Sequence, residues 1–306
     1  MDEVSVLAPA TVANVVCGFD CLGFALGEPF DEMIVRRIDE PVVRIVNVDD
    51  FGLPTEPERN VAGVALQAFI EAARLDHGFE IVSNKQIMPG SGIGSSAASA
   101  CGAVVAANAL TGERFTKLEL VEIAMAGEAL ASGSRHADNL APCIYGGFTL
   151  VRSTEPLDIV EIDFPPLFAT VIHPQIEIKT SEARAMLPKD VPLKSAIRNW
   201  SNLGSLVAAL AKGDYDLIAR SLEDTIVEPV RKSLIPKFDE VKSAALFAGA
   251  LGGGISGSGP SIFMLSDNEA TSQTVATEMA RVFEGTNMNF NVHVSKIADS
   301  GVRVHQ

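Results

Sequence analysis

The stretch MPGSGIGSSAASAC, Met88 to Cys101, is the centre of this sequence. Its glycines alternate with Ser91 and Ile93, and two serines then lead into an alanine-rich apolar run that ends near Leu110. Glycine lets the backbone take positive φ and approach a ligand closely, and serines at the start of a helix cap it or leave their hydroxyls free. Because amide N–H groups and a helix dipole would face the same point, the stretch predicts a phosphate cradle at the head of a buried helix.

Other interpretations of this stretch compete with the cradle. The simplest is a flexible turn before a core helix. A Walker A loop requires Gly-Lys followed by Ser or Thr, and no Gly-Lys pair occurs in the chain. Gly92, Gly94 and Ala97 match the dinucleotide pattern G-x-G-x-x-A, but that motif also needs a second strand ending in an acid about 20 residues later. The run FTKLELVEIAMAGEAL in that region has helical periodicity, which disfavours a dinucleotide site.

The composition narrows the class of protein. The 306 residues are 47% hydrophobic and 21% charged, which allows two domains or one large domain with a sizeable core. A formal net charge of −15 makes nucleic acid and anionic membranes poor partners. The acidic N-terminus has no apolar signal-peptide region, and no apolar run is long enough to cross a bilayer. Without C-x-x-C pairs or clustered histidines, the sequence predicts reduced thiols in a cytoplasmic protein and no zinc site.

The first part of the chain contains one clear helix. Val4 to Leu7 predicts a short strand, and the turn-rich segment APATVANVVCGFD, Ala8 to Asp20, predicts a loop at the surface or at a substrate. Asn60 is a natural N-cap for the apolar-periodic run that ends near Leu75. Residues 79–88 then predict a strand that enters the glycine loop.

A second clear helix carries a charge at an apolar position. Thr116 and Glu119 form a capping-box pair at its start, and the helix runs to Ala131. Its apolar stripe includes Glu128, and a buried carboxylate is costly unless it is paired or bound to a cation. The alternative is a helix that has frayed or rotated at Gly127, which would leave this carboxylate in solvent.

The polar segment that follows, Ser132 to Phe148, concentrates Arg135, His136, Asp138 and Asn139. Loops carry function more often than regular elements do, so the segment predicts a functional loop. The alternative is a plain polar connection in which an aspartate caps a turn.

The second half of the chain predicts a further unit of helices and strands. Its boundary is gradual, between 155 and 175, where prolines break the strands, and Thr180 predicts a cap for a short helix. Three helices are predicted around 197–210, 215–222 and 238–248. The first of them has an apolar face that predicts core packing. That face consists of Trp200, Leu203, Val207 and Leu210.

A second glycine cluster, LGGGISGSGPSIFML, spans Leu251 to Leu265. Its glycines match G-x-G-x-x-G, but Pro260 and a strand-like run follow them, so a dinucleotide site is again disfavoured. Two glycine–serine loops beside strands predict a hairpin that approaches a ligand. A helix at 269–283 and a strand at 290–295 complete the predicted elements.

Three motifs, APATVANVVCGFD, PGSGIGSSAASA and GISGSGPSIF, occur in this order. Together they resemble the motifs of the GHMP kinases. The segments GERFTKLELVEIAMAGEALASGSRHADNLAPCIYGGF, TSEARAMLP and VEPVRKSLIP are similar to the homoserine kinase branch of that family. The resemblance extends from Val4 to near the C-terminus.

The resemblance implies an α+β fold, the GHMP kinase fold, in two domains. Residues 1–165 would form a two-layer α/β ATP-binding domain with a left-handed βαβ crossover, and residues 166–306 a ferredoxin-like α+β domain. The active site would lie between them. The implied reaction is ATP-dependent phosphorylation of the L-homoserine hydroxyl to O-phospho-L-homoserine in threonine biosynthesis. Its cofactors would be ATP and Mg²⁺, and the assembly a homodimer.

The resemblance also implies roles for individual positions. The nucleoside would lie near Asn60, Val61 and Lys85, and Ser96 with Glu128 would hold Mg²⁺. The phosphate loop would comprise Pro89, Gly90, Ser91, Gly92, Ile93, Gly94, Ser95 and Ser96. The catalytic and homoserine-binding residues would be Asn14, Asp20, His136, Asn139, Arg184 and Arg231. Gly257, Ser258 and Gly259 would close the nucleotide pocket from the second domain.

These residue types suit an amino-acid substrate. An arginine fork binds a carboxylate through two hydrogen bonds, and Asp20 can accept hydrogen bonds from an ammonium group. Without the resemblance, Arg184 and Arg231 would be placed on a solvated helix face.

The resemblance also bears on the proton transfer. Mevalonate-type relatives have an aspartate where this chain has Asn139, and asparagine cannot act as a general base. Phosphoryl transfer depends mainly on positioning and charge neutralisation. We therefore expect direct attack by the δ-hydroxyl on the γ-phosphate without a dedicated base, with Asp138 as the alternative proton acceptor.

Two other functions remain open. One is another small-alcohol kinase of the family, such as a mevalonate kinase, which Asn139 and the ammonium partner Asp20 disfavour. The other is a non-catalytic ligand sensor of the same fold, which the intact pair Ser96 and Glu128 disfavours.

Overall fold

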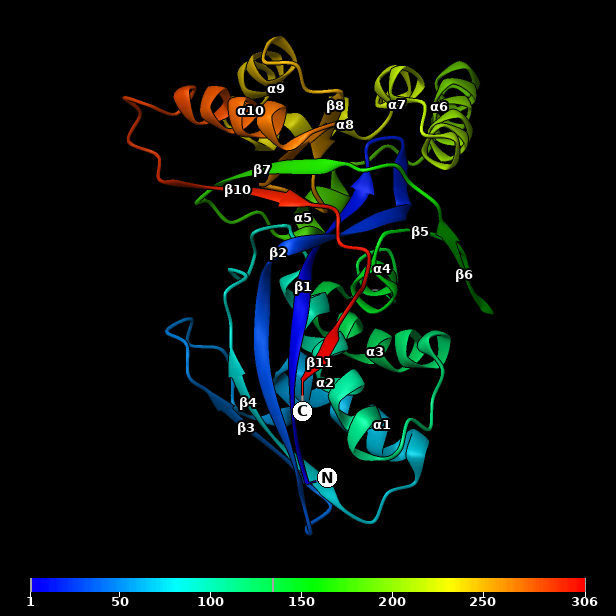
Figure 1. Cartoon of the computed structure of the whole chain (residues 1–306), viewed down its shortest axis with the longest axis vertical. Helices are drawn as coiled ribbons and strands as arrows, with labels where there is room; N and C mark the ends of the chain where they lie inside the picture. Colours follow the sequence, from blue (N-terminus) through cyan, green and yellow to red (C-terminus); the bar gives the residue numbers. More distant parts are fainter. Residues whose placement is uncertain (1, 134, 306) are drawn as a thin grey trace.

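A computed structural model describes residues 2–133 and 135–305 of the chain. These residues form two sheets, one of seven strands and one of four, stacked along the long axis of the molecule (Figure 1). The long hairpin of β1 (Glu3–Val15) and β2 (Gly18–Ile38) connects the two units. It belongs to the first sheet, and at its far end the Ala13 carbonyl accepts a hydrogen bond from the Gly257 N–H of the second unit at 3.1 Å.

The first sheet has the order β11-β1-β2-β4-β3, and β5 and β6 continue it from β2. Besides β1 and β2, its strands are β3 (Val43–Asn47), β4 (Gly78–Asn84), β5 (Phe148–Thr154), β6 (Leu157–Ile162) and β11 (Arg303–His305). β3 and β4 are parallel neighbours joined through η1 (Pro57–Arg59) and α1 (Val61–Ala73). The other strand pairs are antiparallel, so β3, α1 and β4 form a βαβ unit within a mixed sheet.

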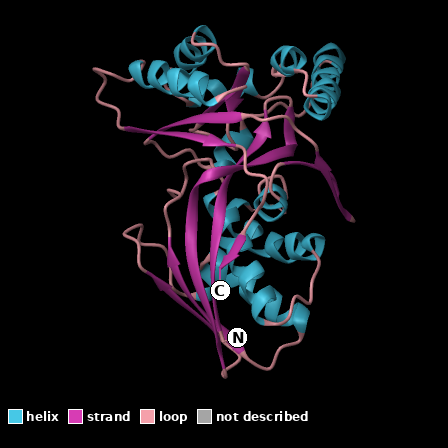
Figure 2. Cartoon of the chain, viewed as in Figure 1, coloured by secondary structure: helices cyan, strands magenta, loops and turns pink. Residues whose placement is uncertain are grey.

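Helices cover one face of this sheet (Figure 2). They are α1, α2 (Ser95–Leu110), α3 (Lys117–Ser132) and α4 (Leu140–Tyr145). α2 packs against β1, β2, α1 and α3, because its small side chains allow a close approach. At Gly102 a Cβ would lie 2.8 Å from the Met33 sulfur on β2. α2 is therefore the buried helix that the glycine loop predicts.

The predicted helix starts of α1 and α3 are confirmed. The Asn60 side chain accepts hydrogen bonds from the N–H groups of Ala62 and Gly63, and Thr116 with Glu119 forms a reciprocal capping box. Each cap satisfies N–H groups that have no partner inside the helix, so these starts depend on local sequence.

The second sheet is antiparallel and has the order β10-β7-β9-β8. Its strands are β7 (Phe168–Pro174), β8 (Gly252–Ile255), β9 (Ile262–Ser266) and β10 (Phe290–Lys296). α9 (Phe238–Phe247) and α10 (Glu269–Arg281) pack against it (Figure 1). Numbered within this unit, the strand order is 4-1-3-2, the ferredoxin-like arrangement. The expected α+β fold is confirmed, and β8 with β9 is the hairpin predicted at the second glycine cluster.

The remaining helices lie between β7 and α9 in the chain. They are α5 (Thr180–Ala185), α6 (Leu193–Lys212), α7 (Tyr215–Ser221), α8 (Glu228–Arg231) and η2 (Lys232–Leu234). The predicted core face of α6 is wrong at Trp200, which is 57% exposed, whereas Leu210 at the other end is buried. α7 packs against α6 but has 7 residues against 20, so it covers only one end of that face.

The segment from Ala8 to Asp20 was expected to be a loop, and that expectation is wrong. β1 continues to Val15 and β2 begins at Gly18. The β1–β2 register shifts between Pro9 and Thr11 and again between Ala13 and Val15. Such bulges accommodate a proline and turn-forming residues inside a strand pair, which is why the composition of the segment resembles a loop.

Smaller differences concern the ends of elements. β4 ends at Asn84, so residues 85–88 already belong to the loop, and Lys179 rather than Thr180 occupies the N-cap of α5. The strands β2, β3 and β11 and the short helical elements η1, α4, α8 and η2 were not predicted. Because β11 pairs with β1, the last strand lies in the first sheet, and the division at 165 and 166 stays a prediction. Within the described ranges, no helix has the length and apolarity needed to cross a membrane.

Candidate active site

A cavity of about 710 Å³ lies between the two units. Most of the predicted site residues line it. Those that do are Asn14, Asp20, Asn60, Val61, Lys85, Pro89, Gly90, Gly92, Gly94, Ser95, Ser96, Glu128, His136, Asn139, Arg184, Arg231, Gly257 and Ser258. Ser91, Ile93 and Gly259 are not in its lining. The cavity joins residues from β1, β2, α2, α3, α5 and α8, which lie far apart in the chain.

The glycine loop has the backbone geometry of an anion cradle. Gly90, Gly92 and Gly94 have φ values of 75°, 81° and 73°, the left-handed region that favours glycine. Gly94 is the N-cap of α2, and as a glycine it makes no side-chain capping hydrogen bond to the first N–H groups of the helix. The side chains of Ser91 and Ile93 between these glycines are buried beneath the loop. The N–H groups at the start of α2 therefore remain available to a ligand.

Hydrogen bonds from two directions orient the peptides of this loop. The hydroxyls of Ser261 and Ser256 donate to the carbonyls of Ser91 and Gly92, at 2.6 and 2.7 Å. The Thr11 N–H donates to the Ile93 carbonyl at 3.1 Å. In a trans peptide the C=O and N–H point in opposite directions. Three successive N–H groups, from Gly92 to Gly94, are thereby turned away from these partners, and such a row forms an anion-binding nest.

The two glycine clusters touch each other. A Cβ at Gly92 would lie 2.6 Å from the Gly259 carbonyl oxygen, and one at Gly257 would lie 3.0 Å from the Gly92 oxygen. The β8–β9 hairpin therefore packs directly on the phosphate loop. This contact requires glycine on both sides, which explains why two separate clusters occur in the sequence.

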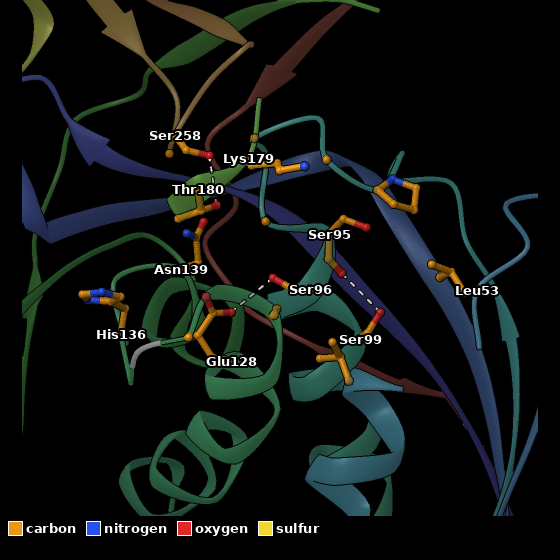
Figure 3. A pocket seen from close by; sticks show the side chains of 18 of the residues that line it. Leu53, Ser95, Ser96, Ser99, Glu128, His136, Asn139, Lys179, Thr180 and Ser258 are labelled. Atoms are coloured by element: carbon orange, nitrogen blue, oxygen red, sulfur yellow. Dashed lines mark hydrogen bonds between the residues drawn. The ribbon is translucent and has the colours of Figure 1, made fainter. Parts of the chain in front are cut away.

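Glu128 is half-buried, faces the head of α2 and lines the cavity. The Ser96 hydroxyl donates to its Oε2 at 3.1 Å (Figure 3). Gly127 is close to α1, since a Cβ there would lie 2.7 Å from the Val61 carbonyl oxygen. This glycine therefore permits close packing of α3 on α1, and α3 continues through it to Ser132.

Ser96 and Glu128 are compatible with a magnesium site. A carboxylate and a hydroxyl are hard oxygen ligands, and Mg²⁺ is usually held by one or two protein groups together with phosphates and water. The described residues contain no group of three or more His, Cys, Asp or Glu side chains that could hold a metal. The pair therefore fits a cation that takes its remaining ligands from a nucleotide.

Lys85, which the resemblance places near the nucleoside, lines the cavity, and its ammonium binds groups of the protein. Its ammonium contacts the Asp31 carboxylate and donates to the Ser95 carbonyl at 3.2 Å and to the Ser99 hydroxyl at 2.9 Å. Both charged side chains are buried. The other Asp31 oxygen accepts from the N–H groups of residues 86 and 87 at 2.8 and 2.9 Å. The buried pair holds the start of the loop against α2.

One end of the cavity includes residues that sequence analysis missed. They are Ile45, Asn47, Leu53, Pro54, Arg59, Ile81 and Ser83, from β3, β4 and the loop between β3 and α1. Apolar side chains on both strands suit the faces of an adenine ring. The strand β3 was not itself predicted, and the alternation of a strand does not tell which face meets a ligand, so no sequence signal identified these residues.

The opposite end gathers two arginines and an aspartate. Arg184 binds both oxygens of Asp20, at 2.9 and 2.7 Å. Arg231 is 2% exposed, donates to the Ala183 carbonyl at 3.1 Å, and stacks over the Phe19 ring at 4.9 Å. Burial and the charge of Arg184 lower the pKa of Arg231. Among the described residues, these two guanidinium groups have one carboxylate ion-pair partner, Asp20, so the pocket that they form suits a further carboxylate.

Asn14 connects this pocket to the second unit. Its Nδ2 donates to the Gly257 carbonyl at 2.8 Å, and its Oδ1 accepts from the Asp20 N–H at 2.7 Å. Both Asn14 and Asp20 have positive φ. The strained end of the β1–β2 hairpin is therefore held by the glycine loop of the second unit.

The segment between α3 and α4 contributes three polar residues to the cavity wall, namely His136, Asp138 and Asn139. Burial raises the pKa of Asp138 to about 7, and the charges of Asp20 and Glu128 act in the same direction. Burial also lowers the pKa of His136. Arg135 is not in the cavity lining. The interpretation as a functional loop therefore fits three of its four polar residues.

The side facing Ser96 and Glu128 carries polar residues from α5 and the hairpin (Figure 3). Thr180 Oγ1 lies 3.3 Å from Ser258 Oγ, and the exposed Lys179 also lines the cavity. Sequence analysis did not single out Lys179, because one exposed lysine at a helix start carries no distinctive signal.

Known proteins are similar to this chain over almost its whole length. Two family models match, "GHMP kinases N terminal domain" at residues 60–147 and "GHMP kinases C terminal" at 206–285. A homoserine kinase of Chloroherpeton thalassium is 46% identical over 99% of this chain and 100% of its own length. One of Methanocella arvoryzae is 40% identical over 99% of this chain and 98% of its length.

Solved structures agree with these matches. The crystal structure of homoserine kinase from Cytophaga hutchinsonii superposes with a TM-score of 0.95 at 48% identity, covering 100% of this chain and 98% of that one. The L. major mevalonate kinase has a TM-score of 0.72 at 15% identity, over 94% of each chain, which shows the shared fold alone. From its fold, its glycine loop and these full-length matches, this chain belongs to the GHMP kinase family, in the homoserine kinase branch.

Proposed function

We propose that this chain transfers the γ-phosphoryl group of ATP to the side-chain hydroxyl of L-homoserine, giving ADP and O-phospho-L-homoserine for threonine biosynthesis. The main support is that one cavity is lined by two kinds of binding group. An anion cradle at the head of α2 lies at one part of it, and Asp20, Arg184 and Arg231 lie at another. The full-length similarity to homoserine kinases supports the same substrate.

The phosphates of ATP would bind the N–H groups of the loop, from Gly92 into the first turn of α2. Ser96 and Glu128 would hold Mg²⁺, which would neutralise charge on the phosphates when bound. The nucleoside would lie against Val61, Ile45 and Ile81. Lys85 would act beneath the loop through Asp31 and would not touch the nucleoside.

Homoserine would bind as a zwitterion at the Asp20–Arg184 pair. Its carboxylate would accept hydrogen bonds from Arg184 and Arg231, and its ammonium would donate to Asp20. The substrate ammonium would replace Arg184 as the partner of Asp20, and the substrate carboxylate would replace Asp20 as the partner of Arg184. No buried charge would therefore be left unpaired.

The reaction would be a direct transfer. The homoserine δ-oxygen attacks the γ-phosphorus, the bond from that phosphorus to the β–γ bridging oxygen breaks, and ADP leaves with the electron pair. The hydroxyl proton passes to solvent or to the transferred phosphate. Asp138 is the alternative acceptor for this proton, because its raised pKa suits proton transfer near neutral pH. If Asp138→Asn abolished turnover while homoserine still bound, a protein base would be required.

A panel of acceptor alcohols with ATP and Mg²⁺, followed by ADP release, tests the proposal. L-homoserine should give turnover at least about 10²-fold above mevalonate, because a site that pairs an ammonium loses that partner with mevalonate. Preference for another alcohol would replace the substrate assignment. Thermal stabilisation by ligands with no ADP formed on any acceptor would point to the sensor alternative.

We also propose a cytoplasmic homodimer, an expectation that comes from the family resemblance. Sedimentation equilibrium should give twice the chain mass of 32.3 kDa. A single species at the chain mass would remove the dimer from the proposal.

A further inference from the structure

The buried hydroxyl of Thr11 joins the phosphate loop to the segment before α4. Thr11 is 0% exposed, and its Oγ1 donates to Asn139 Oδ1 at 2.8 Å. Its backbone N–H donates to the Ile93 carbonyl at 3.1 Å. At Gly94 a Cβ would lie 2.0 Å from the Thr11 hydroxyl and 3.1 Å from Asn139 Oδ1. The side chains of Thr11 and Asn139 therefore meet beside Gly94 at the head of α2, next to the first N–H groups of the cradle.

The Thr11 hydroxyl determines which way the Asn139 amide points. A carboxamide has one acceptor oxygen and an NH₂ donor group, which exchange places when the amide turns over. Among the described residues, Asn139 Oδ1 is the one acceptor recorded for the Thr11 hydroxyl. Turning the amide over would leave a buried O–H without an acceptor, which is unfavourable. The oxygen is therefore held by Thr11, and the NH₂ group is left for other partners.

The Asn139 NH₂ group is available to a ligand. Asn139 is the N-cap of α4, but its side chain makes no capping hydrogen bond. Within the described part of the chain, no hydrogen bond uses its Nδ2. Asn139 lines the cavity, in the neighbourhood of Ser96 and Glu128 from α2 and α3 (Figure 3). Its two N–H groups are therefore further donors in the wall of the cavity that the phosphate loop also lines.

We propose that Thr11 is a positioning residue that locks Asn139 as a hydrogen-bond donor to the phosphoryl group during transfer. This inference rests on the proposed kinase function and deepens it. Donors already aimed at developing negative charge stabilise a transition state without reorganisation. An aspartate in place of Asn139 would use one oxygen for Thr11 and present the other, as an anion, to the phosphates. Asn139 thus contributes to the transfer as a hydrogen-bond donor, although it cannot act as a base.

The test uses kcat and the KM values for ATP and homoserine in a set of variants. Asn139→Ala should lower kcat by about 10²-fold, the usual effect of removing one such donor. Thr11→Val, which removes the hydroxyl and keeps the shape, should lower kcat by about tenfold, because the amide can then turn over. Both KM values should stay within about threefold, since the effect belongs to the transition state. Thr11→Ser should restore kcat.

A double mutant separates this role from general support of the fold. If Thr11 acts through Asn139, then Thr11→Val with Asn139→Ala should be no slower than Asn139→Ala alone. The proposal would be overturned if the losses of kcat in the two single variants multiplied in the double variant. A Thr11→Ser variant as slow as Thr11→Val would also overturn it. If Thr11→Val fails to fold, Thr11→Cys serves instead, since a thiol is a weak donor and should give an intermediate kcat.

Asn139→Asp tests the donor role directly. It should be at least as slow as Asn139→Ala, and an Asp variant as fast as the natural chain would overturn the donor role. The acceptor panel on the natural chain judges the kinase proposal separately. An inactive natural chain would reject the kinase function itself, whereas an active chain with multiplying losses would reject only the role of Thr11.

Discussion

Asp138 is a buried carboxyl on the wall of the cavity, and its environment costs stability when it ionises. Its pKa in the folded chain is about 7, above the ordinary value of 3.8. The folded state therefore holds this proton more tightly than the unfolded state does. Its contribution to stability is fully present below the unfolded pKa and is lost as pH rises towards 7.

Asp138→Asn should consequently stabilise the chain at high pH. We expect its unfolding midpoint at pH 8 to exceed that of the natural chain by about 2 °C or more. The difference should disappear near pH 4, where both side chains are neutral. Asp190→Asn, at an exposed position, is the control and should show no such pH dependence. Equal midpoints for Asp138→Asn and the natural chain at pH 8 would show that burial does not penalise this carboxylate.

Glu128 provides a second prediction at this scale. Glu128→Gln keeps the size of the side chain and a partner for Ser96 but removes the charge that would hold Mg²⁺. Turnover should fall by about 10² or more, with the unfolding midpoint little changed. Glu122→Gln, exposed on the same helix, is the matched control and should keep full activity. Full activity in Glu128→Gln with Mg²⁺ and ATP would remove the metal role.

At the scale of elements, the site depends on the contact between the phosphate loop and the β8–β9 hairpin. Two hydroxyls of the hairpin bind loop carbonyls, and glycines on both sides let the backbones touch. The second unit thus orients the N–H groups of the first. This explains how a glycine-rich loop, flexible in isolation, is held in one conformation.

Gly92→Ala tests this contact, and the chain offers a matched control. Gly92 and Gly112 have nearly the same φ, 81° and 82°. A Cβ at Gly112 would have nothing within 4 Å, whereas one at Gly92 would lie 2.6 Å from a backbone oxygen. Gly112→Ala should lose about 1–2 kcal/mol of stability, the cost of a left-handed alanine. Gly92→Ala should lose more and also bind ATP more weakly, measured by calorimetry. Equal losses in both variants would mean that the loop contact contributes nothing.

At the scale of the whole molecule, the cavity spans two units that the chain connects repeatedly. The β1–β2 hairpin reaches into the second unit, and β11 returns from the second to the first. The Asp20–Arg184 pair bridges them across the cavity, between residues 164 positions apart. Homoserine and ATP would therefore bind to, and stabilise, different parts of the same molecule.

Arg184→Leu should separate the two ligands. We expect ATP still to raise the unfolding midpoint, because the cradle is intact, and homoserine to lose its effect, because one arm of its carboxylate site is gone. Arg198→Leu breaks another Arg–carboxylate pair, to Glu223 on the outside of the second unit, and should leave both ligand effects unchanged. Stabilisation by homoserine that survives in Arg184→Leu would place the amino acid elsewhere.

The sequence by itself determined the elements whose signals are local. Asn60, Thr116 and Glu119 cap helices through hydrogen bonds to residues two or three positions away, so their types and spacing predict the start of each helix. The alternating glycines before α2 likewise predicted an anion cradle, because φ preference is a property of the single residue. The motifs around them allowed the family, the fold and the substrate class to be expected before the structure was known.

Only the tertiary structure decided how distant residues meet. The pairing of Asp20 with Arg184, and of Thr11 with Asn139 across 128 positions, follows from how strands and helices pack. The exposure of Trp200 depends on how far α7 extends along α6, and the strand at Ala8 to Val15 depends on a partner that tolerates two bulges. These outcomes depend on long-range packing, because the energy of a contact depends on both partners and a sequence pattern describes only one of them.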